Sequence, residues 1–202
     1  ADYPVTEDRT EAEVLSLIDD LQKQETTLIE KYINFIGLSA SEKKNVVNCI
    51  SLSTILKSNI RKFDSPGNFN EIKSTYLIPR ANFAINEVGK SYPDDEKVVR
   101  ALRNYAVTTN ILLDSIFSNL AKEKNLENEN FHNAIDRFTN NEQQKLSLSQ
   151  KAILLINSVP QISSTLVGMK NPNYVDDVQK SIKSDYVKQY VEFWHNNGNS
   201  IQ

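Results

Sequence analysis

Apolar residues recur at intervals of three and four along most of this chain. The first run comprises Val14, Ile18, Leu21, Leu28, Tyr32 and Phe35. Because an α-helix turns once every 3.6 residues, this spacing gathers apolar side chains into one stripe. The chain has only 5 glycines in 202 residues, whereas turn-rich β folds need glycine at positive φ. The sequence therefore predicts an all-α fold: a single helical-bundle domain over residues 1–202, with six or seven mostly antiparallel amphipathic helices.

Helix-start signals divide the apolar pattern into segments. Thr10 with Glu13 and Ser39 with Glu42 have the spacing of capping boxes. They predict helices over about 11–37 and 40–63. Pro93, followed by three acidic residues, predicts the start of a helix that runs to about residue 120. A short helix after residue 125, one over about 148–169 and a last one over about 175–193 complete the series. Residues 1–9 are expected to be a polar lead-in, and 197–202 a frayed tail.

Two prolines interrupt the helical pattern. Pro79 lies within a third helical segment over residues 70–88 and is predicted to kink it or divide it into two short helices. Pro160 is predicted to kink its helix, because proline lacks the backbone N–H and clashes with the preceding turn. Each is followed by Val-Gly, a lysine, a proline and two aspartates in the same order, about 80 residues apart. This echo suggests an internal duplication. The alternative is that proline, glycine and aspartate simply recur wherever helices meet.

Composition narrows the partners that the chain can have. A net charge of −3 with scattered charges of both signs leaves no basic face for nucleic acid. The single Cys49 excludes an internal disulfide and lies on an apolar stripe, where a thiol acts as a small hydrophobe. The start at Ala1, without methionine, favours a secreted or periplasmic mature end over a cloning remnant.

An uncharged stretch over residues 152–169 is the least polar part of the chain. It is too short and contains too many polar residues for a membrane span, which needs about 20 mostly apolar residues. We expect a buried helix of the bundle here. The alternative is an insertion hairpin of the kind that a helical pore-forming protein needs.

Both histidines of the chain follow a glutamate by three residues, as Glu129 with His132 and Glu192 with His195. Paired Glu-x-x-His motifs build di-metal sites in four-helix bundles when they point inward. At 100° per residue, however, both pairs point away from the apolar stripes of their helices. The sequence therefore predicts outward-facing imidazoles, no metal and no cofactor.

Three polar residues interrupt apolar stripes near the middle of their helices: Glu25, Ser53 and Thr109. If these helices pack side by side, the three side chains form a polar layer at one level of the bundle. Such a layer fixes the register of the helices or binds water, an ion or a small polar ligand. The alternative places Glu25 at the edge of the bundle, where its side chain bends outward and its carboxylate lies in water.

No phosphate-binding loop or nucleophile–base pair is recognisable, so we expect a protein that is not an enzyme. The leading hypothesis is a protein–protein interaction module with an unidentified protein partner. Three aromatic residues near turns or off the main stripes are its candidate contacts: Tyr92, Tyr174 and Trp194. The alternatives are a carrier that holds a small or apolar ligand between helices, and a pore-forming or membrane-active helical protein.

Overall fold

The computed structural model describes residues 3–168, 175–176, 178–179, 181 and 185–197. Its described helices include α1 (Glu11–Lys31), α2 (Ala40–Ile50), α3 (Leu52–Asn59), α4 (Pro66–Ile72), α5 (Ile78–Ser91), α6 (Glu96–Asp136), α7 (Leu148–Asn157) and α9 (Tyr190–Asn197). No strand occurs within these described ranges, so the predicted all-α fold is confirmed.

The chain divides into two compact units, which we call the N-terminal unit (residues 3–124) and the C-terminal unit (residue 125 onward). Helix α6 supplies residues to both. The single domain over residues 1–202 stays a prediction, as does the internal duplication.

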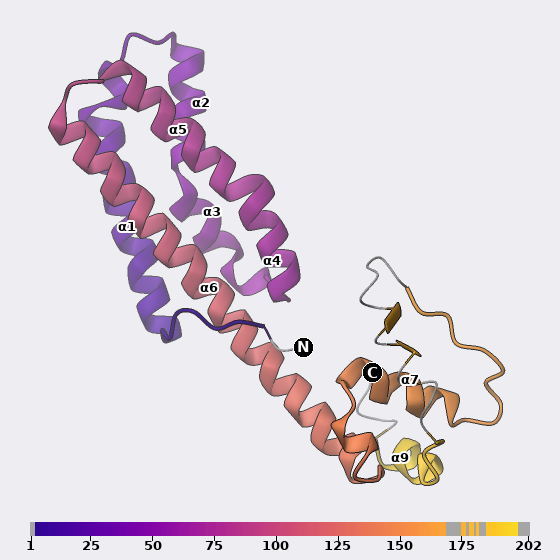
Figure 1. Ribbon diagram of the computed structural model, residues 1–202. Coiled ribbons are helices and arrows are strands. Elements are labelled where there is room, and N and C mark those ends of the chain that lie inside the picture. Colours follow the sequence, from indigo (N-terminus) through magenta and orange to yellow (C-terminus); the bar gives the residue numbers. More distant parts are fainter. Residues whose placement is uncertain (1–2, 169–174, 177, 180, 182–184, 198–202) are drawn as a thin grey trace. The chain divides into compact units, whose positions relative to one another are not determined.

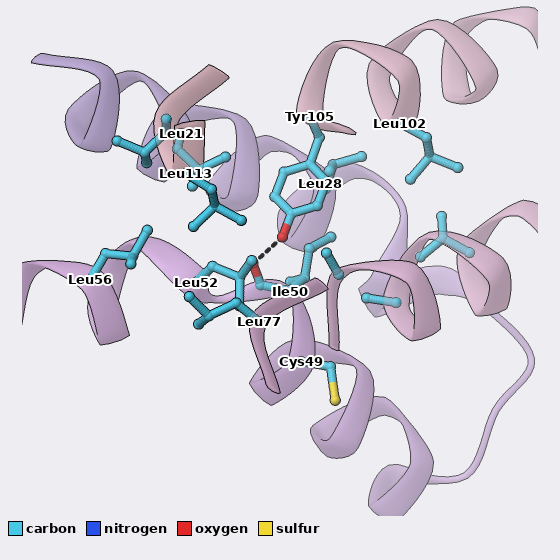
Figure 2. Close-up of a cluster of buried hydrophobic side chains, with 14 of the residues drawn as sticks. Leu21, Leu28, Cys49, Ile50, Leu52, Leu56, Leu77, Leu102, Tyr105 and Leu113 are labelled. Carbon is cyan, nitrogen blue, oxygen red and sulfur yellow. Dashed lines mark hydrogen bonds between the residues drawn. The ribbon is translucent and has the colours of Figure 1, made fainter. Parts of the chain in front are cut away.

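The N-terminal unit is a bundle of antiparallel neighbours (Figure 1). After α1, the chain reverses direction through α2 and α3. It reverses again through α4 and α5, and α6 then runs antiparallel to α5. Their apolar stripes meet in one core, part of which is drawn in Figure 2, with Leu21, Leu28, Leu52, Leu56 and Leu77 all buried. The spacing of apolar residues thus predicts correctly which faces of the helices are buried.

Both predicted capping boxes are present. The Thr10 hydroxyl accepts from the Glu13 N–H at 3.3 Å, and the Glu13 carboxylate accepts from the Thr10 N–H at 2.7 Å. Ser39 and Glu42 repeat the arrangement at the start of α2. Each box satisfies two backbone donors that have no partner within the helix. The starts of α1 and α2 are therefore predictable from the sequence.

The predicted helix over 40–63 is divided in the structure. α2 ends at Ile50, and α3 begins at Leu52. At the break, the Ser51 hydroxyl donates to the Val47 carbonyl oxygen at 2.8 Å, a bond that competes with regular helix geometry.

The predicted interruption at Pro79 takes the form of a π-helical segment, Lys73–Leu77, between α4 and α5. The Ile78 N–H donates to the Lys73 carbonyl oxygen, five residues earlier. Pro79 then lies in the first turn of α5, where its missing N–H is not needed.

Three predicted helices have different limits in the structure. α7 ends at Asn157 instead of continuing through a kink at Pro160, because proline removes a helical donor and restricts the residue before it. The helices expected on either side of residue 125 are one continuous α6, which starts at Glu96 instead of Pro93. The last predicted helix is interrupted at residues 185–189, and part of it lies outside the described residues.

Candidate functional site

The polar layer forms where the chain breaks between α2 and α3. Glu25 on α1 is only 3% exposed, which excludes the alternative in which it bends into water. Its Oε1 accepts from the Ser53 N–H at 2.8 Å, and its Oε2 accepts from the Ser53 hydroxyl. Glu25 therefore binds the start of α3, where the first N–H groups have no helical partner and an acid is favoured.

Tyr105 completes this layer from α6. Its hydroxyl donates to the carbonyl oxygen of Ile50, the last residue of α2, at 2.9 Å (Figure 2). The two sides of the helix break are therefore bound by two side chains from other helices, Glu25 on α1 and Tyr105 on α6. Tyr105 could not be recognised as a member of this layer from the sequence, because an aromatic residue on an apolar stripe is typical of an ordinary core position.

Burial dominates the electrostatics of the layer. Desolvation raises the pKa of Glu25 from 4.5 to about 7, although the hydrogen bonds from Ser53 lower it. Desolvation also raises the pKa of Tyr105, and the nearby charge of Glu25 adds to that effect. Glu25 is thus a core carboxyl group that changes charge near neutral pH.

Thr109, the third predicted member, is also buried. Its hydroxyl has no partner with regular hydrogen-bond geometry within the described part of the chain, although its interaction with the Tyr105 hydroxyl opposes the rise in the Tyr105 pKa. The structure brings Glu25 and Ser53 into direct contact, and both make internal hydrogen bonds. This arrangement suits a helix junction that fixes register. Ligand binding by the layer stays a prediction.

A mostly apolar groove of about 540 Å³ lies between α5 and α6. Its lining comprises Ile85, Asn86, Gly89, Lys90, Val99, Leu102, Arg103 and Ala106. Gly89 widens the groove because it has no side chain: a Cβ there would lie 3.8 Å from Leu102 Cδ1, an ordinary contact. Val99 is 52% exposed on the opposite wall. Both charged residues of the lining are basic.

The three predicted partner contacts lie elsewhere. Tyr92 donates its hydroxyl to the Tyr32 carbonyl oxygen at 3.1 Å and packs edge-on against the Tyr32 ring. Trp194 packs edge-on against Phe193 and keeps about a third of its surface exposed. Tyr174 lies outside the described residues. Partner binding by these side chains stays a prediction.

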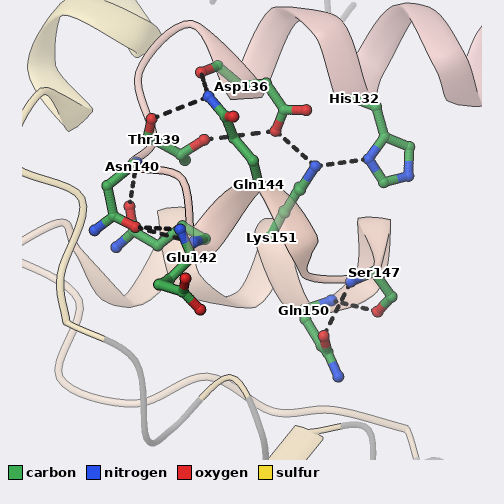
Figure 3. Close-up of polar contacts among 10 residues, drawn as sticks. His132, Asp136, Thr139, Asn140, Glu142, Gln144, Ser147, Gln150 and Lys151 are labelled. Carbon is green, nitrogen blue, oxygen red and sulfur yellow. Dashed lines mark hydrogen bonds and ion pairs between the residues drawn. The ribbon is translucent and has the colours of Figure 1, made fainter.

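One histidine departs from the predicted outward orientation. His195, Glu129 and Glu192 are exposed, as predicted. His132 is only partly exposed, and its Nδ1 lies 2.9 Å from Nζ of Lys151, a buried lysine on α7 (Figure 3). The outward orientation was predicted from the apolar stripe of its own helix alone. The prediction is wrong for His132 because α7 packs against this face of α6.

Within the described ranges, no group of three or more His, Cys, Asp or Glu side chains is placed to hold a metal ion. None of the described helices combines the length and the apolar character needed to cross a membrane. Residues 162–168, from the uncharged stretch, are not helical.

The sequence matches no model of a protein family, and no curated protein and no solved structure is significantly similar to it. Its function has to be inferred from the geometry of this chain.

Proposed function

We propose that this protein is a non-enzymatic protein-interaction module that binds an amphipathic helix of its partner in the groove between α5 and α6. The observation that supports this proposal is the groove itself. It is lined mainly by aliphatic side chains, and Val99 on its wall is half exposed. Apolar surface that the fold leaves uncovered is typical of docking sites, and a groove between two helices suits a third.

The charges at the groove favour an acidic partner. Lys90 and Arg103 are the charged residues of the lining, although the whole chain carries a net charge of −3. Lys90 is paired with Glu87 at 2.7 Å, whereas Arg103 forms no ion pair within the described residues. An adjoining hollow at the start of α6 shares Val99 and Arg103 with the groove and also contains Asp94, Glu96 and Arg100. The expected preference for acidic residues therefore depends mainly on Arg103.

A displayed library of helical peptides tests this proposal. Leucine, isoleucine or phenylalanine occupies positions i, i+3, i+4 and i+7, and glutamate or lysine is randomised at the remaining positions. We expect selection on the full chain to enrich glutamate over lysine. The Kd of a selected peptide is then measured by calorimetry.

Two valines on α6 provide a matched pair of variants. Val99 lines the groove and Val107 does not, yet each is 52% exposed. We expect Val99→Glu to raise the Kd of the selected peptide at least tenfold, since it places an acid in the groove. Val107→Glu should change this Kd less than twofold. Equal effects of the two substitutions, enrichment of lysine, or no enriched peptide would overturn the proposal. So would a dimer of this chain that Val99→Glu dissociates, because a second copy would then occupy the groove.

A further inference from the structure

The C-terminal unit contains a buried lysine whose two partners lie on one helix. Lys151 on α7 is 1% exposed, and a buried ammonium group is costly unless its hydrogens find acceptors. Its Nζ lies 2.6 Å from Asp136 Oδ1 and 2.9 Å from His132 Nδ1 (Figure 3). Residues four apart share a face of a helix, so the end of α6 presents both acceptors to α7.

This geometry fixes the protonation state of the imidazole. An ammonium group can only donate hydrogen bonds, so His132 Nδ1 must be unprotonated to accept one. Protonation of Nδ1 in a ring that already carries its proton on Nε2 would make an imidazolium and place two cations in contact. The ring would then turn away toward solvent, which is open to it because His132 is only partly buried, or compete with Lys151 for Asp136. Either change weakens the link between α6 and α7.

The other charged groups around His132 do not replace this link. On α6, Glu129 is exposed, and the Asp136 carboxylate already binds Lys151. Lys151 is the one charged residue within Leu148–Asn157. In the short turn before α7, Glu142 and Lys145 pair with each other at 2.7 Å.

We infer that His132, Asp136 and Lys151 form an acid-sensitive latch that holds α7 against the end of α6 at neutral pH and releases it in acid. Histidine is the side chain whose charge ordinarily changes between about pH 5 and 8. The core of the C-terminal unit, with Leu154 and Leu155 from α7, would loosen as the latch opens. The latch is independent of the groove proposed for partner binding.

Hydrogen exchange measured by mass spectrometry on the full chain tests the latch. We expect protection of the amides in residues 148–157 to fall at least tenfold between pH 7.5 and 5.5, after correction for intrinsic exchange rates. His132→Asn should abolish this fall, because the asparagine oxygen accepts a hydrogen bond without titrating. His195→Asn is the matched control: it removes the exposed histidine of the same unit and should leave the fall intact.

A titration of the wild-type protein by NMR tests the latch without any variant. We expect the amide shifts of α7 to change with the same midpoint as the His132 ring, and not with that of His195. A fall in protection that persists in His132→Asn, constant protection across this pH range, or α7 shifts that follow His195 would each overturn the latch.

Discussion

Replacing Glu25 with glutamine removes a titrating group from the core of the N-terminal unit with little change in shape. The amide oxygen of the introduced glutamine can still accept from the Ser53 N–H, which lies 2.8 Å from Glu25 Oε1 in the wild type. The substitution therefore separates the charge of this side chain from its role at the start of α3. We expect it to abolish the pH dependence of stability that Glu25 confers.

The direction of this pH dependence of stability follows from the raised pKa of Glu25. The Glu25 pKa is about 7 in the folded chain, against an ordinary value of 4.5, so the folded state binds more protons between these two values. The free energy of unfolding therefore falls as pH rises from 4.5 through 7. By proton linkage, this pKa shift lowers the free energy of unfolding by about 2.5 kcal/mol between pH 5 and pH 8. Acid thus stabilises the N-terminal unit, whereas it opens the latch of the C-terminal unit.

Hydrogen exchange of peptides from α1 and α3 measures this effect in the unit that contains Glu25. The single tryptophan, Trp194, lies in the other unit, so its fluorescence reports on that unit separately. The opening free energy of α1 in the wild type should fall by about 2.5 kcal/mol from pH 5 to pH 8, and in Glu25→Gln it should change far less. An unchanged pH dependence in Glu25→Gln, or a wild-type unit that gains stability as pH rises, would refute the reasoning.

Three further substitutions test the helix break and the caps. Tyr105→Phe leaves the buried Ile50 carbonyl without its 2.9 Å donor and should cost about 1–3 kcal/mol in chemical denaturation; a loss below measurement error would contradict the role of this hydroxyl. Ser53→Ala removes a hydrogen bond that lowers the Glu25 pKa, so the pH midpoint of N-terminal-unit stability should move upward, and a downward shift would contradict this assignment. Thr10→Ala removes one half of a capping box and should cost about 1 kcal/mol, seen as faster exchange in the first turn of α1; unchanged exchange there would count against the cap.

Local features of the fold were predictable from the sequence because their causes are local. A capping box needs only residues three apart, and an apolar stripe needs only the helical repeat. The starts of α1 and α2, and the burial of Leu21 and Leu28, follow from these patterns. The helix break at Ser51 and the end of α7 before Pro160 were not predicted correctly, because helical spacing alone does not show where a helix ends.

The chain by itself determined that three polar residues interrupt apolar stripes, and that its histidines each follow a glutamate by three residues. Only the tertiary structure decided what these residues contact. Glu25 meets Ser53 across 28 positions in sequence, and His132 meets Lys151 across 19. The reason is physical: a periodic pattern specifies which face of a helix is buried, but the partner of a buried polar group depends on which helices pack together.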